Sequence, residues 1–459
     1  MGRLFGTDGA RGVANTELTC ELAMQIGRAA AMVLIEGDHQ RPKVMIGSDT
    51  RLSGEMLESA LAAGLCSVGA DVLLLGVVPT PAVAYLVKEY GYDAGIMISA
   101  SHNPYEYNGI KIFQANGFKL PDMLENAIES IILDDVATPP AKVGAEIGTI
   151  TRSETAHSDY INHILSTSEY RYNGMKVALD CANGSSSTTA RKLFEYLGCE
   201  CIVIGAEPNG ININDQCGST HVEALQQVVK ENGCDVGFAF DGDADRLIAV
   251  DENGEIVDGD KIIALCAMDM KETGRLKNDT AVVTVMSNMG FFKFADENGI
   301  HCEKTKVGDR YVLENMLEND FIIGGEQSGH IIFREHATTG DGELSALKLL
   351  CVMKETGKKL SELAAEMTVF PQVLINVRVS QMGKARYNND AEIKKAIESA
   401  ERELGDDGRV LVRVSGTEPL VRVMLEGKDI EEITAIANKI ADEIKRTCHS
   451  IASPKGTEK

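Results

Sequence analysis

The sequence predicts an α/β fold with three α/β units and a smaller C-terminal α+β domain, and three observations predict it. Short β-rich apolar runs alternate with longer helical patterns over most of the 459 residues, which is typical of α/β proteins. The same rhythm restarts near residue 175 and again near residue 281. After Pro371 it changes to a strand, a helix, two strands and a helix. At roughly 150 residues per domain the length predicts about three domains, and this change of pattern adds a fourth.

Each unit is predicted from its own apolar runs. In the first unit we expect strands at 43–47, 72–75 and 94–99, with helices at 54–69 and 80–90. The second and third units open with strands at 175–180 and 281–286, and the last domain has helices at 389–403 and 430–447 around strands at 409–414 and 420–426. The Pro- and Gly-rich stretch 138–148, the hydrophilic turn 251–254 and the region around Pro371 are the expected boundaries, which give domains 1–150, 151–252, 253–368 and 369–459.

The charge balance limits the partners. The 45 Lys and Arg against 69 Asp and Glu leave a net charge of −24, which repels nucleic acids and anionic membrane surfaces. An anionic ligand must therefore be captured by a local cluster of Arg, Lys and backbone amides. Because no apolar stretch approaches the roughly 18 residues of a spanning helix and the N-terminus lacks the apolar core of a signal peptide, we expect a cytoplasmic protein with no nucleic-acid or membrane partner. The eleven cysteines contain no Cys-x-x-Cys pair, so neither a zinc site nor a disulfide framework is expected.

The loop 100–104 follows an apolar strand and presents a serine. Ser101 lies just past the predicted strand end, where a hydroxyl is well placed to react. A serine hydroxyl is a weak nucleophile without a base or a cation, and His102 and Lys111 are the nearest candidates. The alternative is a Ser-His-Asn-Pro turn in which the hydroxyl bonds its own backbone.

The segment DGDADR at 241–246 places three carboxylates at alternate positions between two predicted strands. In a tight loop Asp241, Asp243 and Asp245 can converge on one hard divalent cation. An EF-hand is excluded, because Arg246 occupies the position that needs glycine and the flanks are strands. Mg²⁺ fits, since it prefers a few carboxylates plus phosphate oxygens to a full protein cage. The alternative, a solvated acidic turn, would hold Asp243 between two apolar strands at a high cost.

Two further loops suit a phosphorylated sugar. RVSGTEP at 413–419, followed by Arg422, joins two strands and offers arginines, hydroxyls and a glycine amide to phosphate oxygens, with a plain hairpin turn as the alternative. GGEQSGH at 324–330 offers a carboxylate, an amide, a hydroxyl and an imidazole to sugar hydroxyls, with a polar Gly-rich turn as the alternative.

GTDGARG at 6–12 follows no predicted strand and matches no Walker or dinucleotide fingerprint, and Arg11 is its one phosphate-competent side chain.

Taken together and in chain order, GTDGARG, ISASHNP, DGDADR, GGEQSGH and RVSGTEP resemble the α-D-phosphohexomutase superfamily over nearly the whole chain. Gln327 and the runs 212–214 and 217–221 are similar to its glucosamine branch. The resemblance implies three α/β domains with mixed sheets and a C-terminal α+β domain similar to the TATA-binding protein, arranged around a central cleft.

The resemblance also implies a role for each motif residue. Ser101 is implied to be a phosphoserine, and Asp241, Asp243 and Asp245 are implied to bind one Mg²⁺ together with the Ser101 phosphate. The sugar hydroxyls are implied to be bound by Glu326 and Ser328. The phosphate that is not transferred is implied to be held by Arg413, Ser415, Gly416, Thr417 and Arg422. The reacting oxygens are implied to be surrounded by Arg11, His102, Lys111, Arg246 and His330, among which Lys111 and His330 are the candidates for proton transfer.

The activity implied by the resemblance is an isomerisation by a mutase. Glucosamine 6-phosphate and glucosamine 1-phosphate would interconvert through the phosphoserine and glucosamine 1,6-bisphosphate, which feeds UDP-N-acetylglucosamine and peptidoglycan precursor synthesis. Two alternatives stay open: a phosphomannomutase/phosphoglucomutase of broader specificity, and a non-catalytic sugar-phosphate-binding regulator on the same scaffold. The sequence also leaves a homodimer open.

Overall fold

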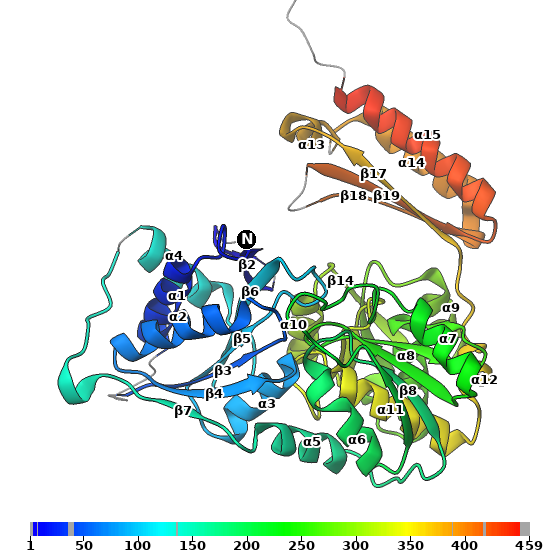
Figure 1. Cartoon of the computed structure of the whole chain (residues 1–459). Helices are drawn as coiled ribbons and strands as arrows, with labels where there is room; N and C mark the ends of the chain where they lie inside the picture. The colour runs from blue at the N-terminus through cyan, green and yellow to red at the C-terminus, as the bar shows by residue number, and fades with distance from the viewer. Residues whose placement is uncertain are drawn as a thin grey trace, which may run out of the picture. The chain divides into compact units, whose positions relative to one another are not determined.

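The computed structural model describes residues 3–6, 8–34, 41–134, 136–387, 389–415 and 419–449 (Figure 1). These residues form two compact units. The larger unit consists of the described parts of Met1–Ser287 and Ala295–Glu366, and the smaller unit of Asn288–Phe294 with the described part of Met367–Lys459. None of the helices among the described residues combines the length and the apolar character that crossing a membrane requires.

The first sheet of the larger unit has seven strands and carries the serine loop. Its strand order is β1 (Phe5–Gly6), β2 (Gly9–Val13), β6 (Tyr107–Gln114), β5 (Ala94–Ile98), β3 (Lys43–Ser48), β4 (Asp71–Val77) and β7 (Ile150–Arg152). The sheet is mixed, because β3 is parallel to β4 and β5 whereas β6 is antiparallel to β5 and β2. Its helices are α1 (Cys20–Val33), α2 (Gly54–Ser67), α3 (Thr80–Glu89) and α4 (Asp122–Leu133). Every residue of β5 is buried, as expected for a strand whose two faces are both covered by helices.

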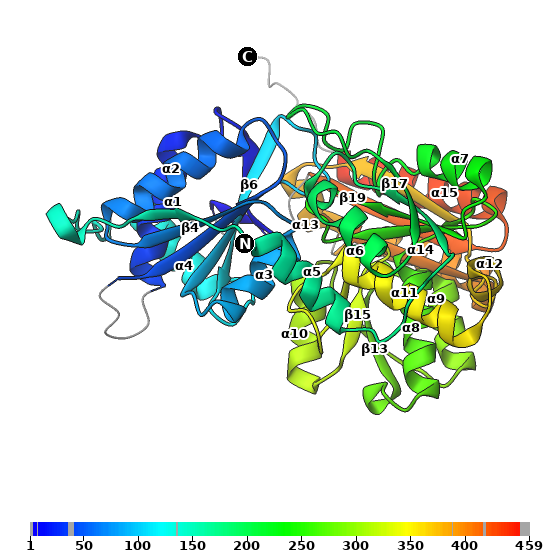
Figure 2. The same ribbon diagram turned by 60° about the horizontal axis from the view of Figure 1, so that its bottom comes forward.

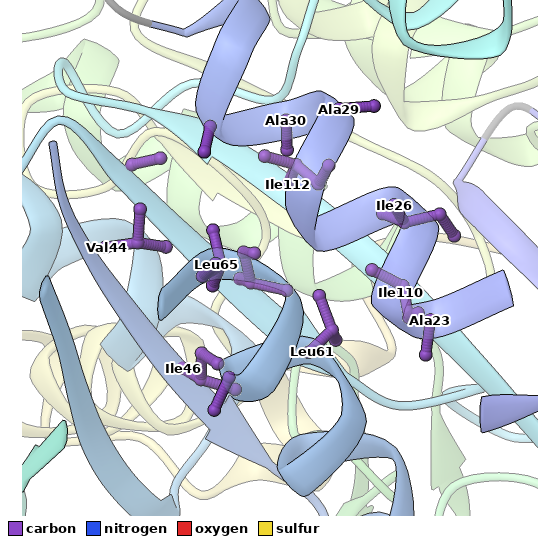
Figure 3. Close-up of a cluster of buried hydrophobic side chains, with 14 of the residues drawn as sticks. Ala23, Ile26, Ala29, Ala30, Val44, Ile46, Leu61, Leu65, Ile110 and Ile112 are labelled. Carbon is purple, nitrogen blue, oxygen red and sulfur yellow. The ribbon is translucent and has the colours of Figure 1, made fainter. Parts of the chain in front are cut away.

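An apolar cluster joins α1 and α2 to this sheet (Figure 3). Ile26 of α1 and Leu61 and Leu65 of α2 pack in one cluster with Ile46 and Ile110 of the strands, and all five side chains are fully buried. Burial of such a side chain stabilises the fold by roughly 1.5–3 kcal/mol. The cluster therefore fixes the strands from whose ends the site residues project.

The second sheet has five strands and carries the metal loop. Its order is β12 (Ile256–Val257), β11 (Leu247–Asp251), β10 (Val236–Phe240), β8 (Lys176–Asp180) and β9 (Glu200–Ile204). β8 is parallel to β9 and β10, and β10 forms an antiparallel hairpin with β11. The helices of this part of the chain are α5 (Ala156–Ser166), α6 (Ala190–Tyr196) and α7 (Glu223–Asn232).

The third sheet has four strands and carries the predicted sugar loop. Its order is β14 (His301–Thr305), β13 (Thr280–Thr284), β15 (Ile323–Gly325) and β16 (Ile331–Phe333), in which β15 and β16 form an antiparallel hairpin. The helices in this part of the sequence are α8 (Gly259–Glu272), α9 (Met289–Glu297), α10 (Asp309–Asn319), α11 (Gly342–Thr356) and α12 (Leu360–Ala364), and α10 lies beside β13 and β15 (Figure 2).

The smaller unit is built on an antiparallel sheet. Its strand order is β17 (Gln372–Arg378), β19 (Leu420–Gly427) and β18 (Gly408–Val414), and its helices are α13 (Gln381–Tyr387), α14 (Ala391–Leu404) and α15 (Ile430–His449). Apolar residues of α14 and α15 pack on one face of the sheet (Figure 1).

The segment Asn288–Phe294 belongs to this smaller unit, although its sequence lies among the elements of the third sheet. The Asn288 side-chain amide exchanges two hydrogen bonds with the backbone of Phe370, both at 3.0 Å. The Met289 N–H donates to Glu426 Oε2 at 2.9 Å. The unit is therefore completed by residues distant in the sequence.

The predicted fold class is confirmed by three mixed sheets and one antiparallel α+β domain. The elements expected from the apolar runs are present with ends within two residues of the prediction. Elements to which the sequence analysis assigned no bounds include α13, α4, β6 and the hairpin of β1 with β2, so GTDGARG does contain strand residues. The boundaries at residues 150, 252 and 368 stay predictions. Near the first of them β7 (150–152) pairs with β4 of the first sheet, and near the second β12 (256–257) pairs with β11 of the second sheet.

Candidate active site

The loop after β5 holds Ser101 in a buried position. Its φ of 54° lies in the left-handed region, which costs a non-glycine residue on the order of 1–3 kcal/mol. The Ser101 hydroxyl donates to Asp241 Oδ2 at 2.6 Å, and His102 Nδ1 lies 3.4 Å from the same hydroxyl oxygen. The predicted nucleophile is therefore in direct contact with the predicted metal loop.

The β10–β11 hairpin brings Asp241, Asp243 and Asp245 together. One carboxylate oxygen of each lies within 4.8 Å of the others, and all three side chains are buried, so the loop is not a solvated acidic turn. Asp243 Oδ1 and Asp245 Oδ1 are buried without a hydrogen-bond partner. Converging carboxylate oxygens suit a hard divalent cation such as Mg²⁺, and the three aspartates therefore fit a metal site.

The carboxylates of Asp241 and Asp245 differ in their proton affinity. Burial, followed by the neighbouring Asp245 and Asp243, raises the pKa of Asp241 well above its ordinary value. Burial also opposes the ionisation of Asp245, but Lys111, His330 and Arg246 together outweigh it, so the pKa of Asp245 is lowered. A cation bound at Asp241, the residue bonded to Ser101, would relieve the repulsion from the neighbouring carboxylates.

Lys111 extends from β6 into this cluster. Its Nζ lies 2.7 Å from Asp243 Oδ2, 3.1 Å from Asp8 Oδ2 and 3.5 Å from Asp245 Oδ2. Thr80 Oγ1 donates to the same Asp243 oxygen at 2.6 Å. Burial lowers the pKa of Lys111, but Asp243 and Asp8 outweigh this and raise it, so the ammonium stays charged inside the protein.

A second buried network contains the predicted imidazole. Lys119 Nζ pairs with Asp309 Oδ2 at 2.6 Å. His330 lies between two carboxylates, with Nε2 3.5 Å from Asp309 Oδ2 and Nδ1 3.6 Å from Asp245 Oδ1. Burial lowers the pKa of His330, but Asp245 and Asp309 outweigh it and raise the pKa above its ordinary value. In its neutral form the Nε2 atom accepts the Gly340 N–H at 3.0 Å.

Arg11, Arg246 and His102, all predicted from the sequence, influence one another electrostatically. The Arg11 guanidinium pairs with the Asp8 carboxylate, and the backbone N–H of Arg246 donates to Asp241 Oδ1 at 3.2 Å. Burial, followed by Arg246 and Arg11, lowers the pKa of His102 to about 4. His102 is therefore neutral at physiological pH, and the two guanidinium groups supply positive charge beside the aspartates.

The predicted sugar loop joins β15 and β16. Glu326 Oε1 accepts the Gly308 N–H at 3.0 Å. Burial lowers the pKa of Arg246, but the aspartates of the metal loop together with Glu326 raise it. Ser328 is exposed at the turn, and Gln327 Nε2 donates to Asp258 Oδ2 at 3.1 Å. The loop thus leaves Ser328 accessible, whereas the Glu326 carboxylate is bonded to the Gly308 N–H.

The predicted phosphate loop belongs to the smaller unit. Arg413 on β18 and Arg422 on β19 are direct cross-strand partners. Burial, followed by the charge of Arg422, lowers the pKa of Arg413. Ser415 is buried directly after β18, whereas Gly416 and Thr417 lie outside the described residues. Two like charges side by side on a sheet repel each other, which favours binding of an anion.

Four residues of the site were missed from the sequence: Asp8, Thr80, Lys119 and Asp309. Asp8 lies inside GTDGARG, so the motif itself was a signal for it. Thr80 reaches Asp243 across 163 positions and Lys119 reaches Asp309 across 190, and no local pattern marks such contacts.

Comparison with known families gives four consecutive matches. The models described as phosphoglucomutase/phosphomannomutase alpha/beta/alpha domains I, II and III match residues 2–138, 158–254 and 258–370, and the model of the C-terminal domain matches residues 374–443. Together they cover most of the chain.

Curated relatives are similar over almost the full length. The phosphoglucosamine mutase of Thermoanaerobacter sp. (strain X514) is 59% identical over 446 residues, which are 97% of this chain and 99% of the relative. The phosphoglucosamine mutase of Clostridium novyi (strain NT) is 53% identical over 450 residues, 98% of this chain and 100% of the relative.

Solved structures share the fold. A phosphoglucomutase/phosphomannomutase family protein from Burkholderia thailandensis superposes with a TM-score of 0.80 at 24% identity and 98% coverage of both chains. An N-acetylphosphoglucosamine mutase from Aspergillus fumigatus, solved with GlcNAc-6P and magnesium, gives a TM-score of 0.63 at 19% identity, covering 97% of this chain and 96% of the other. At these identities the likeness concerns the fold.

Proposed function

The chain belongs to the phosphoglucomutase/phosphomannomutase family, and on that premise we propose that it interconverts D-glucosamine 6-phosphate and D-glucosamine 1-phosphate. Relatives named for this activity match nearly the whole chain at 53–59% identity. The observation that carries the proposal is the 2.6 Å hydrogen bond from Ser101 Oγ to Asp241, because it joins a nucleophile to a buried cluster of carboxylates.

We assign one Mg²⁺ per chain to Asp241, Asp243 and Asp245, with a phosphate oxygen of Ser101 as a further ligand. The buried oxygens Asp243 Oδ1 and Asp245 Oδ1, which lack a hydrogen-bond partner, support this assignment. When bound, the ion supplies positive charge against the phosphoryl oxygens.

Ser101 carries the phosphoryl group that is transferred. A free sugar hydroxyl forms the new P–O bond, the bond between phosphorus and Ser101 Oγ breaks, and the sugar proton passes to a base. Such a transfer depends on positioning and on positive charge around the phosphoryl oxygens, which Lys111, Arg246 and Arg11 provide. Lys111 and His330 are the candidates for holding the proton in the two directions.

The remaining motif residues bind the rest of the substrate. Glu326 and Ser328 bind the sugar hydroxyls. The phosphate that is not transferred is bound by Arg413, Ser415, Gly416, Thr417 and Arg422. The first transfer yields glucosamine 1,6-bisphosphate, which is both intermediate and activator and turns end for end so that its other phosphate returns to Ser101. Cationic groups suit this task, because an arginine holds phosphate oxygens irrespective of the sugar end that carries them.

The proposal also covers the setting of the reaction. The partner is a small sugar phosphate, the location is the cytoplasm, and the product feeds UDP-N-acetylglucosamine and peptidoglycan precursor synthesis.

The test is conversion of either monophosphate by the purified protein with Mg²⁺ and a trace of bisphosphate, followed by ³¹P NMR. Specificity constants for the glucosamine, glucose and mannose phosphates separate the proposal from a mutase of broader specificity.

The variant Ser101→Gly tests the nucleophile, since it removes the hydroxyl and tolerates the positive φ. Loss of activity is expected, together with loss of the phosphoryl mass from the intact protein. Full activity in this variant, or no conversion by phosphorylated wild-type protein, would contradict the proposal.

A further inference from the structure

A buried arginine lies next to the serine loop. Arg51 stands between β3 and α2 and is 3% exposed. Its Nε pairs with Asp49 Oδ2 at 2.8 Å, and neither side chain of this ion pair is accessible to solvent. Arginine is almost never fully buried unless it is paired, so the short segment 49–51 maintains a cation inside the domain.

The other N–H groups of Arg51 bond to backbone carbonyls of the serine loop and of Tyr107, the first residue of β6. Nη2 donates to Ser101 O and to Asn103 O, both at 2.8 Å. Nη1 donates to Tyr107 O at 3.0 Å and to Pro104 O. A guanidinium is planar and presents its donors in a fixed fork, so one rigid group sets these four carbonyls relative to one another.

The backbone N–H of Ser101 is connected through Ser99 to the ion pair of Asp49 and Arg51. The Ser101 N–H donates to Ser99 Oγ at 2.9 Å, and Ser99 Oγ donates to Asp49 Oδ2 at 2.6 Å. Asp49, Arg51 and Ser99, which we call the loop clamp, therefore bind both peptide groups of Ser101.

The loop clamp gives a physical reason for the backbone of the nucleophile. A φ of 54° is unfavourable for serine, and it persists where surrounding hydrogen bonds over-determine it. With the backbone held, the hydroxyl lies 2.6 Å from Asp241 Oδ2.

We propose that Arg51 is a positioning residue of the phosphoryl transfer, fixing the Ser101 backbone so that the hydroxyl returns to one place after each half of the reaction. The inference rests on the proposed mutase function. Arg51 does not act on the reacting atoms itself, because its N–H groups are bonded to Asp49 and to the serine loop.

The test is the variant Arg51→Lys. Lysine keeps a positive charge beside Asp49, but an ammonium cannot reproduce the fork. We expect kcat to fall about 100-fold, the effect of misplacing a reacting group by about 1 Å. The KM for glucosamine 6-phosphate should not change, because no sugar-binding group is altered. In a single turnover, transfer from isolated phosphoenzyme to glucosamine 6-phosphate should slow by the same factor.

Arg28→Lys is the matched control. Arg28 Nη2 donates to the Pro139 carbonyl at 3.1 Å, so this variant also removes a guanidinium–carbonyl hydrogen bond, but not one of the serine loop. Its kcat should equal that of the wild type, and thermal unfolding of both variants shows that they are folded.

The outcomes separate the inference from the proposed function. Wild-type kcat in Arg51→Lys would overturn the inference, as would an equal loss of kcat in Arg28→Lys. If Arg51→Lys does not fold, the variant Ser99→Ala provides the test, because it removes the acceptor of the Ser101 N–H. We expect its kcat to fall about 10-fold at unchanged KM. A wild-type kcat in Ser99→Ala would overturn the inference. A wild-type protein that converts no amino-sugar phosphate contradicts the proposed function instead.

Discussion

Replacing Gly242 by alanine should slow phosphoryl transfer about 100-fold. Gly242 stands directly after Asp241 in the metal loop. A Cβ at this position would lie 2.6 Å from the carbonyl oxygen of Ser101 and 2.8 Å from Ile213 Cδ1. The end of the isoleucine side chain can turn away, but the Ser101 carbonyl is backbone and can yield only if the nucleophile moves.

The expected loss of rate follows from how far the Ser101 carbonyl oxygen must move away from the new Cβ. The carbonyl oxygen must move from 2.6 Å to the 3.4 Å of ordinary contact, a displacement of about 0.8 Å. It also accepts hydrogen bonds from Arg51 at 2.8 Å and from Asn214 at 2.9 Å, which oppose the movement. A misplacement of about 1 Å costs about 100-fold in rate, and the overpacking itself lowers the free energy of unfolding by about 1–3 kcal/mol.

The assay is kcat with saturating glucosamine 6-phosphate, Mg²⁺ and bisphosphate, next to urea unfolding of the same preparation. Gly54→Ala is the control, because a Cβ there would meet nothing closer than the Asp49 carbonyl at 3.6 Å. It should keep wild-type activity. Wild-type kcat in Gly242→Ala would refute the reasoning, since the metal loop would then not limit the position of Ser101.

Three further predictions concern the metal, the pH and the core. Mg²⁺ at about 100 times its dissociation constant should raise the free energy of unfolding by about 2.7 kcal/mol, seen as a higher Tm, and an equal gain in Asp243→Asn would contradict the metal site. Burial raises the pKa of Asp341 from 3.8 to about 7, so the folded state binds its proton more tightly; stability should fall as pH rises between these values, and Asp341→Asn should flatten that part of the urea-unfolding profile. Leu61→Ala should cost about 2–5 kcal/mol in urea unfolding because the side chain is fully buried, whereas Leu52→Ala, at a side chain 70% exposed, should stay within about 0.5 kcal/mol.

Local patterns predict those parts of the fold in which one segment carries the whole signal. β5 is an apolar run because both of its faces are buried, and Ser101 follows its end within three residues. The three aspartates of the metal loop lie at alternate positions within five residues, so their convergence also has a local cause. α13 has no such signal, since it is only seven residues long and contains Gly383.

The rest of the site depends on contacts that the sequence does not encode locally. Lys111 enters the metal loop from a strand of another sheet, and its charge there depends on Asp243, 132 positions away. Arg51 looks like an ordinary charged residue near a helix start, and its burial becomes visible only when the serine loop folds over it.

The segment Asn288–Phe294 limits how the gene can be divided. A fragment beginning at Met367 would lack the Asn288 amide that bonds to Phe370 and the Met289 N–H that bonds to Glu426. The Glu426 carboxylate, 0% exposed in the intact protein, would lose a donor, and buried acceptors without partners are costly. The C-terminal domain is therefore not one contiguous segment that a single boundary in the sequence separates from the rest. A chimera between two relatives should take Asn288–Phe294 and the C-terminal domain from the same parent.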